Sequence, residues 1–174
     1  MKLHHEGMYG IPAVDLFRVF TDRAFYEGRF AKSGEDESVE FVHFGPRGNH
    51  FVIDVLRHVR MRSNANIPAI AQRFVRDVNV LHSVMEWDLS PRGDAWHGAY
   101  RMEIERMPIT VTGRMSIEPR SSGCVHHLAM DIHCSVPLIG GKLAAMVGER
   151  AERGMKRDHE NTLIYLRENR LVTA

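Results

Sequence analysis

The stretch that decides the fold is Cys124–Asn169, which reads CVHHLAMDIHCSVPLIGGKLAAMVGERAERGMKRDHENTLIYLREN. Its polarity alternates up to Val136, which is typical of a β-strand with one buried face. After Gly140-Gly141 the period becomes helical, and we predict the longest helix of the chain over about residues 142–169. The core face predicted for this helix contains Leu143, Ala144, Val147, Gly148, Ala151, Met155, Thr162 and Leu166.

Upstream of this stretch, alternation with a period of two predicts a run of strands separated by short turns rich in Gly and Pro. The expected strands cover residues 2–9, 38–44, 51–61, 78–88, 96–105, 109–118 and 124–136. Six consecutive strands joined by tight turns form an antiparallel meander, and long twisted strands curl. Because only the C-terminal helix is large enough to cover the apolar face, we predict an α+β fold in which a curved sheet wraps around that helix.

Shorter helices are predicted at two places. Pro12 suits a first helical position, and the spacing of apolar residues up to Phe20 predicts one helix. Thr21-Asp22 can cap a second, which carries Phe25 and Phe30 and ends near Ser33-Gly34. These two short helices follow the first strand.

A third short helix, over 66–76, is predicted between the third and fourth strands, with Asn66 as its N-cap. Its apolar residues follow helical spacing from Ile67 to Val75. One hypothesis is that this helix is a lid over a cavity mouth, with Ile70 and Phe74 pointing inward. The alternative is a plain helical insertion packed on the sheet edge.

Composition bounds the class of protein. The 174 residues correspond to roughly one domain, which we expect to span 1–174. Apolar residues make up 44% and charged residues 26%, which excludes disordered and fibrous classes. The net charge of +1 provides no long-range attraction for nucleic acid or an anionic membrane. The start of the sequence lacks the apolar stretch of a signal peptide, and no apolar run approaches the ~20 residues of a membrane span.

The two cysteines, Cys124 and Cys134, fall in one predicted strand. At ~3.3 Å per residue they lie about 33 Å apart, whereas a disulfide needs Cα atoms within ~7 Å. We therefore expect two free thiols, which suit a reducing compartment such as the cytoplasm.

A cavity is predicted where the C-terminal helix meets the sheet, because small residues occupy or border its inner face at Ala144, Gly148, Ala151 and Gly154. Methionine is abundant, at 10 residues, and suits surfaces that accept variable apolar shapes. The alternative is that the small residues allow tight packing and the methionines fill gaps. We favour the cavity.

The layout resembles the START-like, helix-grip superfamily (SRPBCC), and within it the bacterial domain-of-unknown-function 2505 family. The resemblance covers nearly the whole chain and is most specific over Val136–Leu143, with support from Pro108–Gly113 and from Glu86-Trp87, which lacks the spacer of the family's pattern. It implies a seven-stranded antiparallel sheet gripping the C-terminal helix around a deep apolar cavity, which the superfamily uses for lipids, sterols, polyketides and plant hormones. It implies no catalytic residues.

Histidines offer the next candidate chemistry. Adjacent strand residues point to opposite faces, so neither His4-His5 nor His126-His127 can grip one metal ion. His127, Asp131 and His133 share the outer face of the last strand, and a helix-grip sheet would bring His4 and Glu6 near them. Since these side chains are expected to be exposed, we interpret the set as a solvated face and predict neither a metal site nor a cofactor.

Our first functional hypothesis is a carrier or sensor that binds a small hydrophobic or lipid-like ligand with one polar end. The candidate ligand-binding residues are Ile70, Phe74, Tyr100, Met102, Met115, His126, Met130, Val147 and Met155. The enzyme alternative is a small cyclase, dehydratase or hydrolase using His126 and Tyr100, with Glu86 as partner of an inward Arg57. A third alternative is a partner-binding protein that uses the open sheet edge. Oligomeric state is left open.

Overall fold

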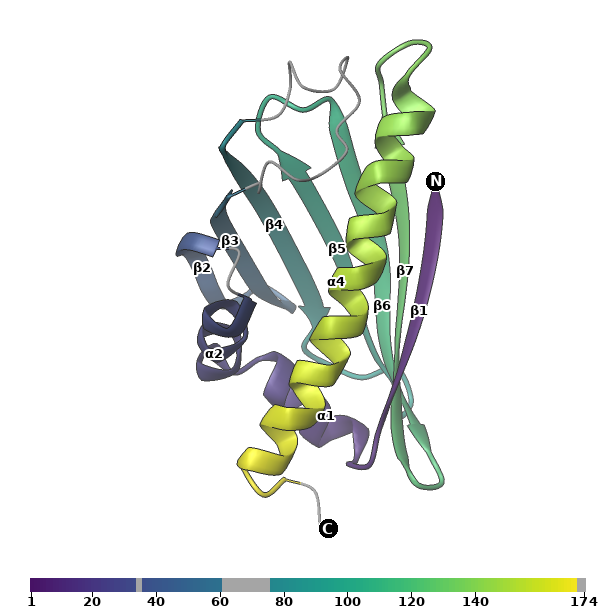
Figure 1. Cartoon of the computed structure of the whole chain (residues 1–174). Coiled ribbons are helices and arrows are strands. Elements are labelled where there is room, and N and C mark those ends of the chain that lie inside the picture. The colour runs from purple at the N-terminus through teal and green to yellow at the C-terminus, as the bar shows by residue number, and fades with distance from the viewer. Residues whose placement is uncertain (34–35, 61–75, 172–174) are drawn as a thin grey trace.

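The fold is a seven-stranded antiparallel sheet with one long helix across its concave face (Figure 1). The structure, a computed structural model, describes residues 1–33, 36–60 and 76–171. Its elements are β1 (Lys2–Tyr9), α1 (Ala13–Phe20), α2 (Arg23–Ser33), β2 (Asp36–Arg47), β3 (His50–Arg60), β4 (Val78–Asp88), β5 (Trp96–Ile104), β6 (Ile109–Arg120), β7 (Gly123–Cys134) and α4 (Gly140–Glu168).

The strand order β1-β7-β6-β5-β4-β3-β2 confirms the meander predicted from the alternating pattern. Every neighbouring pair is antiparallel, and β1 departs from sequence order by pairing with β7. In that pair Gly7 lies opposite His126 and Glu6 lies opposite His127. Pairing of β1 with β7 therefore places residues from the start of the chain beside residues of the last strand, and each face of the sheet carries side chains from both strands.

Helix α4 crosses the concave face diagonally, from the end of β7 toward α1 and α2 (Figure 1). Its buried residues are Gly140, Leu143, Ala144, Val147, Gly148, Met155, Thr162 and Leu166. This set contains every residue of the predicted core face except Ala151, which is half-buried, and adds Gly140. The spacing of apolar residues in the sequence thus identified both the helix and the side that meets the sheet.

The two predicted short helices, α1 and α2, close one end of the structure (Figure 1). Phe17 and Phe20 on α1 are both buried, and the ring of Phe17 stacks on Trp96 with 3.7 Å between centroids. The predicted cap of α2 is provided by Asp22, whose Oδ1 accepts a hydrogen bond from the Ala24 amide at 3.0 Å. This aromatic cluster walls off the interior at the end opposite the β7–α4 connection.

The short helix predicted over 66–76, with Ile70 and Phe74, falls outside the described residues except for its last position. Within the described residues no helix has the length and apolar character needed to cross a membrane. Cys124 and Cys134 are both free and both lie in β7, as predicted.

Candidate functional site

A cavity of about 280 Å³ lies between α4 and the concave face of the sheet. Most of its wall is apolar, and seven methionines of the described residues contribute to it: Met85, Met102, Met107, Met115, Met130, Met146 and Met155. Methionine side chains are unbranched and flexible, so a wall of this kind adapts to apolar guests of different shape.

The sequence left open whether the small residues of α4 allow close packing or leave space for a cavity, and different residues do each. Gly148 is buried and packs directly on Met1, so at this position the missing side chain allows close approach. Ala151 and Gly154 instead line the cavity, and a Cβ atom on Gly154 would meet no heavy atom within 4 Å.

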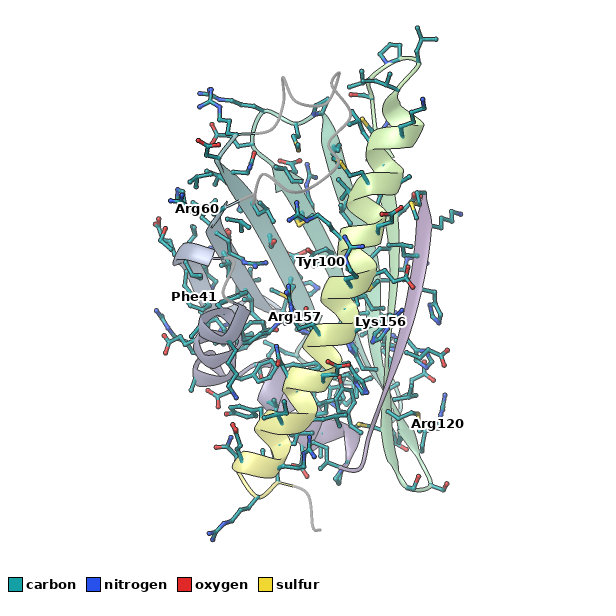
Figure 2. All side chains as sticks on the ribbon, viewed as in Figure 1. Phe41, Arg60, Tyr100, Arg120, Lys156 and Arg157 are labelled. Atoms are coloured by element: carbon teal, nitrogen blue, oxygen red, sulfur yellow. The ribbon has the colours of Figure 1, made fainter. Side chains whose placement is uncertain are left out.

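Of the nine predicted ligand-binding residues, seven line this cavity: Tyr100, Met102, Met115, His126, Met130, Val147 and Met155. Ile70 and Phe74 lie outside the described residues. Figure 2 shows Arg157 reaching from α4 toward the side of the sheet where Tyr100 lies, whereas Lys156 points to the other side of the helix. Arg157 and Tyr100 both line the cavity.

The prediction that Glu86 is the partner of an inward Arg57 was wrong. Glu86 is exposed because it alternates with the buried Trp87, which points inward. In the β3–β4 register Glu86 lies opposite Val52, whereas Arg57 lies opposite Leu81 near the other end of the strands. Arg57 does line the cavity, as predicted, and its guanidinium lies over the ring of Phe30 at 4.9 Å from the centroid.

Four buried polar nitrogens along the cavity wall lack hydrogen-bond partners. They are Nε2 of His5, Nε1 of Trp87, Nε2 of His126 and Nδ1 of His159. Within the described part of the chain these are the buried side-chain polar atoms without a partner, and all four residues line the cavity. Buried polar atoms are nearly always satisfied, so such a group in one wall indicates a site that water or a ligand completes.

The four residues are neighbours. The ring centroid of His126 lies 6.0 Å from that of Trp87, and the centroids of His5 and His159 are also 6.0 Å apart. His159 lies over Gly7, which is the cross-strand partner of His126. We call this group, His5, Trp87, His126 and His159, the polar wall.

The histidines of the polar wall are neutral at pH 7. Burial, together with smaller contributions from the nearby His5 and Arg29, lowers the pKa of His126 to about 3. Burial also lowers the pKa values of His5 and His159. Nearby basic groups add to this shift, namely His4 and Lys156 at His5, and His5 at His159. A neutral imidazole has one N–H donor and one acceptor nitrogen, whereas the indole of Trp87 only donates. The group that completes the wall must therefore accept hydrogen bonds.

An ion pair between α2 and α4 also borders the cavity. Arg29 donates from Nε to Oδ1 of Asp158 at 3.0 Å and from its second nitrogen to Oδ2. This two-point geometry fixes the guanidinium in the plane of the carboxylate. The neighbouring Tyr26 donates to the Met85 sulfur at 3.7 Å, and burial raises the pKa of Tyr26 to about 12.

Sequence reasoning missed His5, Trp87, His159, Arg29 and Asp158. A signal for His159 was present, because position 159 continues the core face of α4 between Met155 and Thr162 at helical spacing. His5 likewise shares the inward face of β1 with Gly7 and Tyr9. Arg29 and Asp158 carried no comparable signal, since their pairing depends on how α2 docks against α4.

No carboxylate or tyrosine of the described residues hydrogen-bonds to Nε2 of His126. The rings of Phe20 and Trp87 lie beside it, with 5.0 Å and 6.0 Å between centroids. Within the described residues, His126 Nε2 therefore borders aromatic rings and has no hydrogen-bonded carboxylate or tyrosine beside it.

Comparison with solved structures identifies the fold. The chain resembles the protein TTHA0849 from Thermus thermophilus at 17% identity and a TM-score of 0.59, over 95% of this chain and 99% of that one. Human STARD10 matches at 14% identity and a TM-score of 0.61, over 97% of this chain and 65% of the other. A START superfamily protein from Mycobacterium smegmatis matches at 12% identity and a TM-score of 0.51, over 99% and 98% of the two chains.

No curated protein matches the sequence. The structural relatives confirm the predicted START-like, helix-grip fold. The model of one sequence family, described as "Protein of unknown function (DUF2505)", matches residues 4–166. Since this match spans nearly the whole length, the chain belongs to the DUF2505 family.

Proposed function

We propose that the protein is a carrier or sensor that binds a small hydrophobic molecule with one polar, oxygen-bearing end in the cavity under α4. The observation that supports this most directly is the polar wall, whose four unpartnered nitrogens interrupt an otherwise mainly apolar cavity. An apolar body would contact the methionines. An oxygen at one end would accept from Trp87 and satisfy the histidines.

The polar end is proposed to be uncharged, such as a hydroxyl or carbonyl group. The polar-wall histidines are neutral at pH 7 and supply no charge to balance a carboxylate. Arg29 is already paired with Asp158, and the other arginines that line the cavity, Arg57, Arg150 and Arg157, also have interaction partners. A hydroxyl group both donates and accepts, so it matches neutral imidazoles and an indole together.

The size of the cavity limits the ligand and its affinity. A volume of about 280 Å³ is near the lower end of the ~300–1,000 Å³ typical of ligand sites. A ligand that buries about 400 Å² of apolar surface gains roughly 10 kcal/mol, and association costs at least ~4 kcal/mol. The difference of about 6 kcal/mol corresponds to a dissociation constant of roughly tens of micromolar. Such an affinity suits reversible transport or sensing.

Native mass spectrometry of the protein purified from its own host tests this proposal. A retained small molecule with an apolar body and an alcohol or carbonyl group is the expected result. A parallel titration with an environment-sensitive fluorescent fatty alcohol tests the location of binding. Repeated absence of both a retained molecule and saturable binding would reject the proposal.

Gly154→Leu is the variant designed to fill the cavity, because Gly154 lines it and has open space around it. Leucine also favours a helix more than glycine, so the variant is expected to fold. Gly141→Leu is the matched control, since Gly141 lies in the same helix and is exposed away from the cavity. We expect Gly154→Leu to lose binding of the fluorescent alcohol and Gly141→Leu to retain it.

A further inference from the structure

A cluster of metal-ligating side chains lies on the outer face of the sheet, across the β1–β7 pair. Nε2 of His4 lies 3.1 Å from Oε1 of Glu6, and Nδ1 of His127 lies 3.2 Å from the same oxygen. The ligand atoms of the three residues all fall within 4.8 Å of one another. The rings of His4 and His127 are stacked, with 5.9 Å between centroids.

The register of the sheet explains this juxtaposition. His4 and Glu6 alternate with the inward His5 and Gly7, and Glu6 lies directly opposite His127. The set differs from the one expected from sequence, because Asp131 lies opposite Lys2 and its carboxylate faces the amino group of Met1 at 3.7 Å. His133 lies beyond the residues that pair with β1.

We propose that His4, Glu6 and His127 form a binding site for a divalent transition-metal ion, with zinc the ion that the donors suit best. Two imidazoles and one carboxylate are a recurrent zinc ligand set, with bonds of about 2.0–2.2 Å. In a tetrahedral site with such bonds, adjacent donor atoms lie about 3.3 Å apart. The distances of 3.1 and 3.2 Å from Oε1 of Glu6 to the nitrogens of His4 and His127 match this spacing. A modest movement of the two imidazoles toward each other would place the three donor atoms at three corners of a tetrahedron.

The surroundings of His127 support the same assignment. Its other ring nitrogen, Nε2, lies 3.7 Å from Oε2 of Glu118. Glu118 is itself held by Ser116, whose hydroxyl donates to Oε1 at 3.1 Å, and by Arg120, which donates to Oε2 at 3.3 Å. A histidine that binds a metal through one nitrogen usually presents the other to a carboxylate, which fixes its orientation and raises its basicity. Glu118 lies just beyond hydrogen-bond distance of Nε2, and a small movement would let it do this.

Exposure defines what kind of site this is. The side chains of His4 and Glu6 are each 56% exposed and that of His127 is 22% exposed. Water therefore completes the coordination, and the site is open and weaker than a buried structural zinc centre. Because its ligands come from an edge strand and its neighbour, a bound ion would tie β1 to β7. We expect zinc to raise the melting temperature for this reason.

Isothermal titration of the full, untagged chain with Zn²⁺ tests the proposal, and a Co²⁺ spectrum reports the coordination geometry. The expected result is binding of one ion per chain with a tetrahedral Co²⁺ absorption band. His127→Ala and Glu6→Gln should each lower the affinity at least about tenfold. Glu118→Gln, a change in a positioning residue, should weaken binding by about tenfold while leaving the Co²⁺ band in place.

His133→Ala is the matched control, because His133 is exposed on the same face of β7 and lies outside the cluster. It should leave the affinity and the melting temperature in zinc unchanged. Far-UV circular dichroism checks that each variant is folded. Equal zinc affinity in the wild type, His127→Ala and Glu6→Gln would overturn the proposal, as would no binding at millimolar Zn²⁺.

Discussion

The ring of His159 fills the position that a side chain would occupy at Gly7. A Cβ atom on Gly7 would lie 2.7 Å from Nδ1 of His159 and 3.1 Å from the hydroxyl oxygen of Tyr9. His159 belongs to α4 and Gly7 to β1, so the contact joins the two ends of the chain. The missing side chain on β1 is what allows an imidazole from the helix to reach the cavity wall beside His126.

Gly7→Ala should therefore displace His159 and Tyr9. Overpacking of a core position costs about 1–3 kcal/mol, and we expect a loss of that size in the free energy of unfolding, measured by urea denaturation. Binding of the fluorescent alcohol should weaken as well, because the polar wall loses one of its members. Gly28→Ala is the control, since a Cβ there meets no atom within 4 Å and alanine favours the helix. An unchanged Gly7→Ala protein would contradict the packing described.

The Arg29–Asp158 pair should stabilise the docking of α2 on α4. The pair is partly exposed to solvent, since the side chains are 26% and 37% exposed, so its contribution is moderate. We expect Arg29→Met to lower the free energy of unfolding by about 1–3 kcal/mol, because it leaves Asp158 without its charged partner.

The double variant Arg29→Met/Asp158→Leu should recover part of that loss, since no unpaired charge remains. Arg18→Met serves as a control because the Arg18–Asp15 pair is exposed, and it should change stability by less than about 0.5 kcal/mol. A double variant less stable than either single variant would argue against this account of the pair.

How much of the molecule the sequence could predict differs between the fold and the site. Alternating polarity and helical spacing depend on which side of an element is buried, and both are local in sequence. They identified the strands and the face of α4 from Leu143 to Leu166. The Glu86 error arose from strand register, because pairing with Arg57 required two positions that lie near opposite ends of the β3–β4 pair.

The polar wall was harder to predict because its members come from four different elements. His5 lies on β1, Trp87 on β4, His126 on β7 and His159 on α4. Only His126 was identified, since it interrupts an apolar face of a single strand. The other three residues come together because of the angle at which α4 crosses the sheet and because Gly7 has no side chain. A local sequence pattern predicts neither of these features.

The tyrosines should make the protein unstable at high pH. Burial raises the pKa of Tyr26 to about 12 and also raises the pKa values of Tyr9, Tyr100 and Tyr165, and the nearby Asp22 adds to the shift at Tyr165. An unfolded tyrosine ionises near pH 10, so above that pH the native state holds more protons than the unfolded state. Stability is therefore complete below about pH 10 and falls as pH rises toward 12.

An absorbance titration at 295 nm measures this directly. The native protein should show little phenolate absorbance at pH 10, and the signal should appear together with loss of near-UV circular dichroism. In guanidinium chloride all four tyrosines should titrate near pH 10. Independent ionisation of Tyr26 near pH 10 in folded protein would contradict its burial.

The His126→Leu variant tests whether His126 binds the ligand or serves only the stability of the fold. Nε2 of His126 is buried without a partner, and an unsatisfied buried polar group costs about 1–3 kcal/mol. Replacing the imidazole with an apolar side chain of similar size should therefore keep or raise the free energy of unfolding of the ligand-free protein. The same change should weaken binding of the fluorescent alcohol about tenfold, because the hydroxyl group loses one hydrogen-bond partner. Lower stability with unchanged binding would mean that His126 serves the fold and that the polar end of the ligand lies elsewhere.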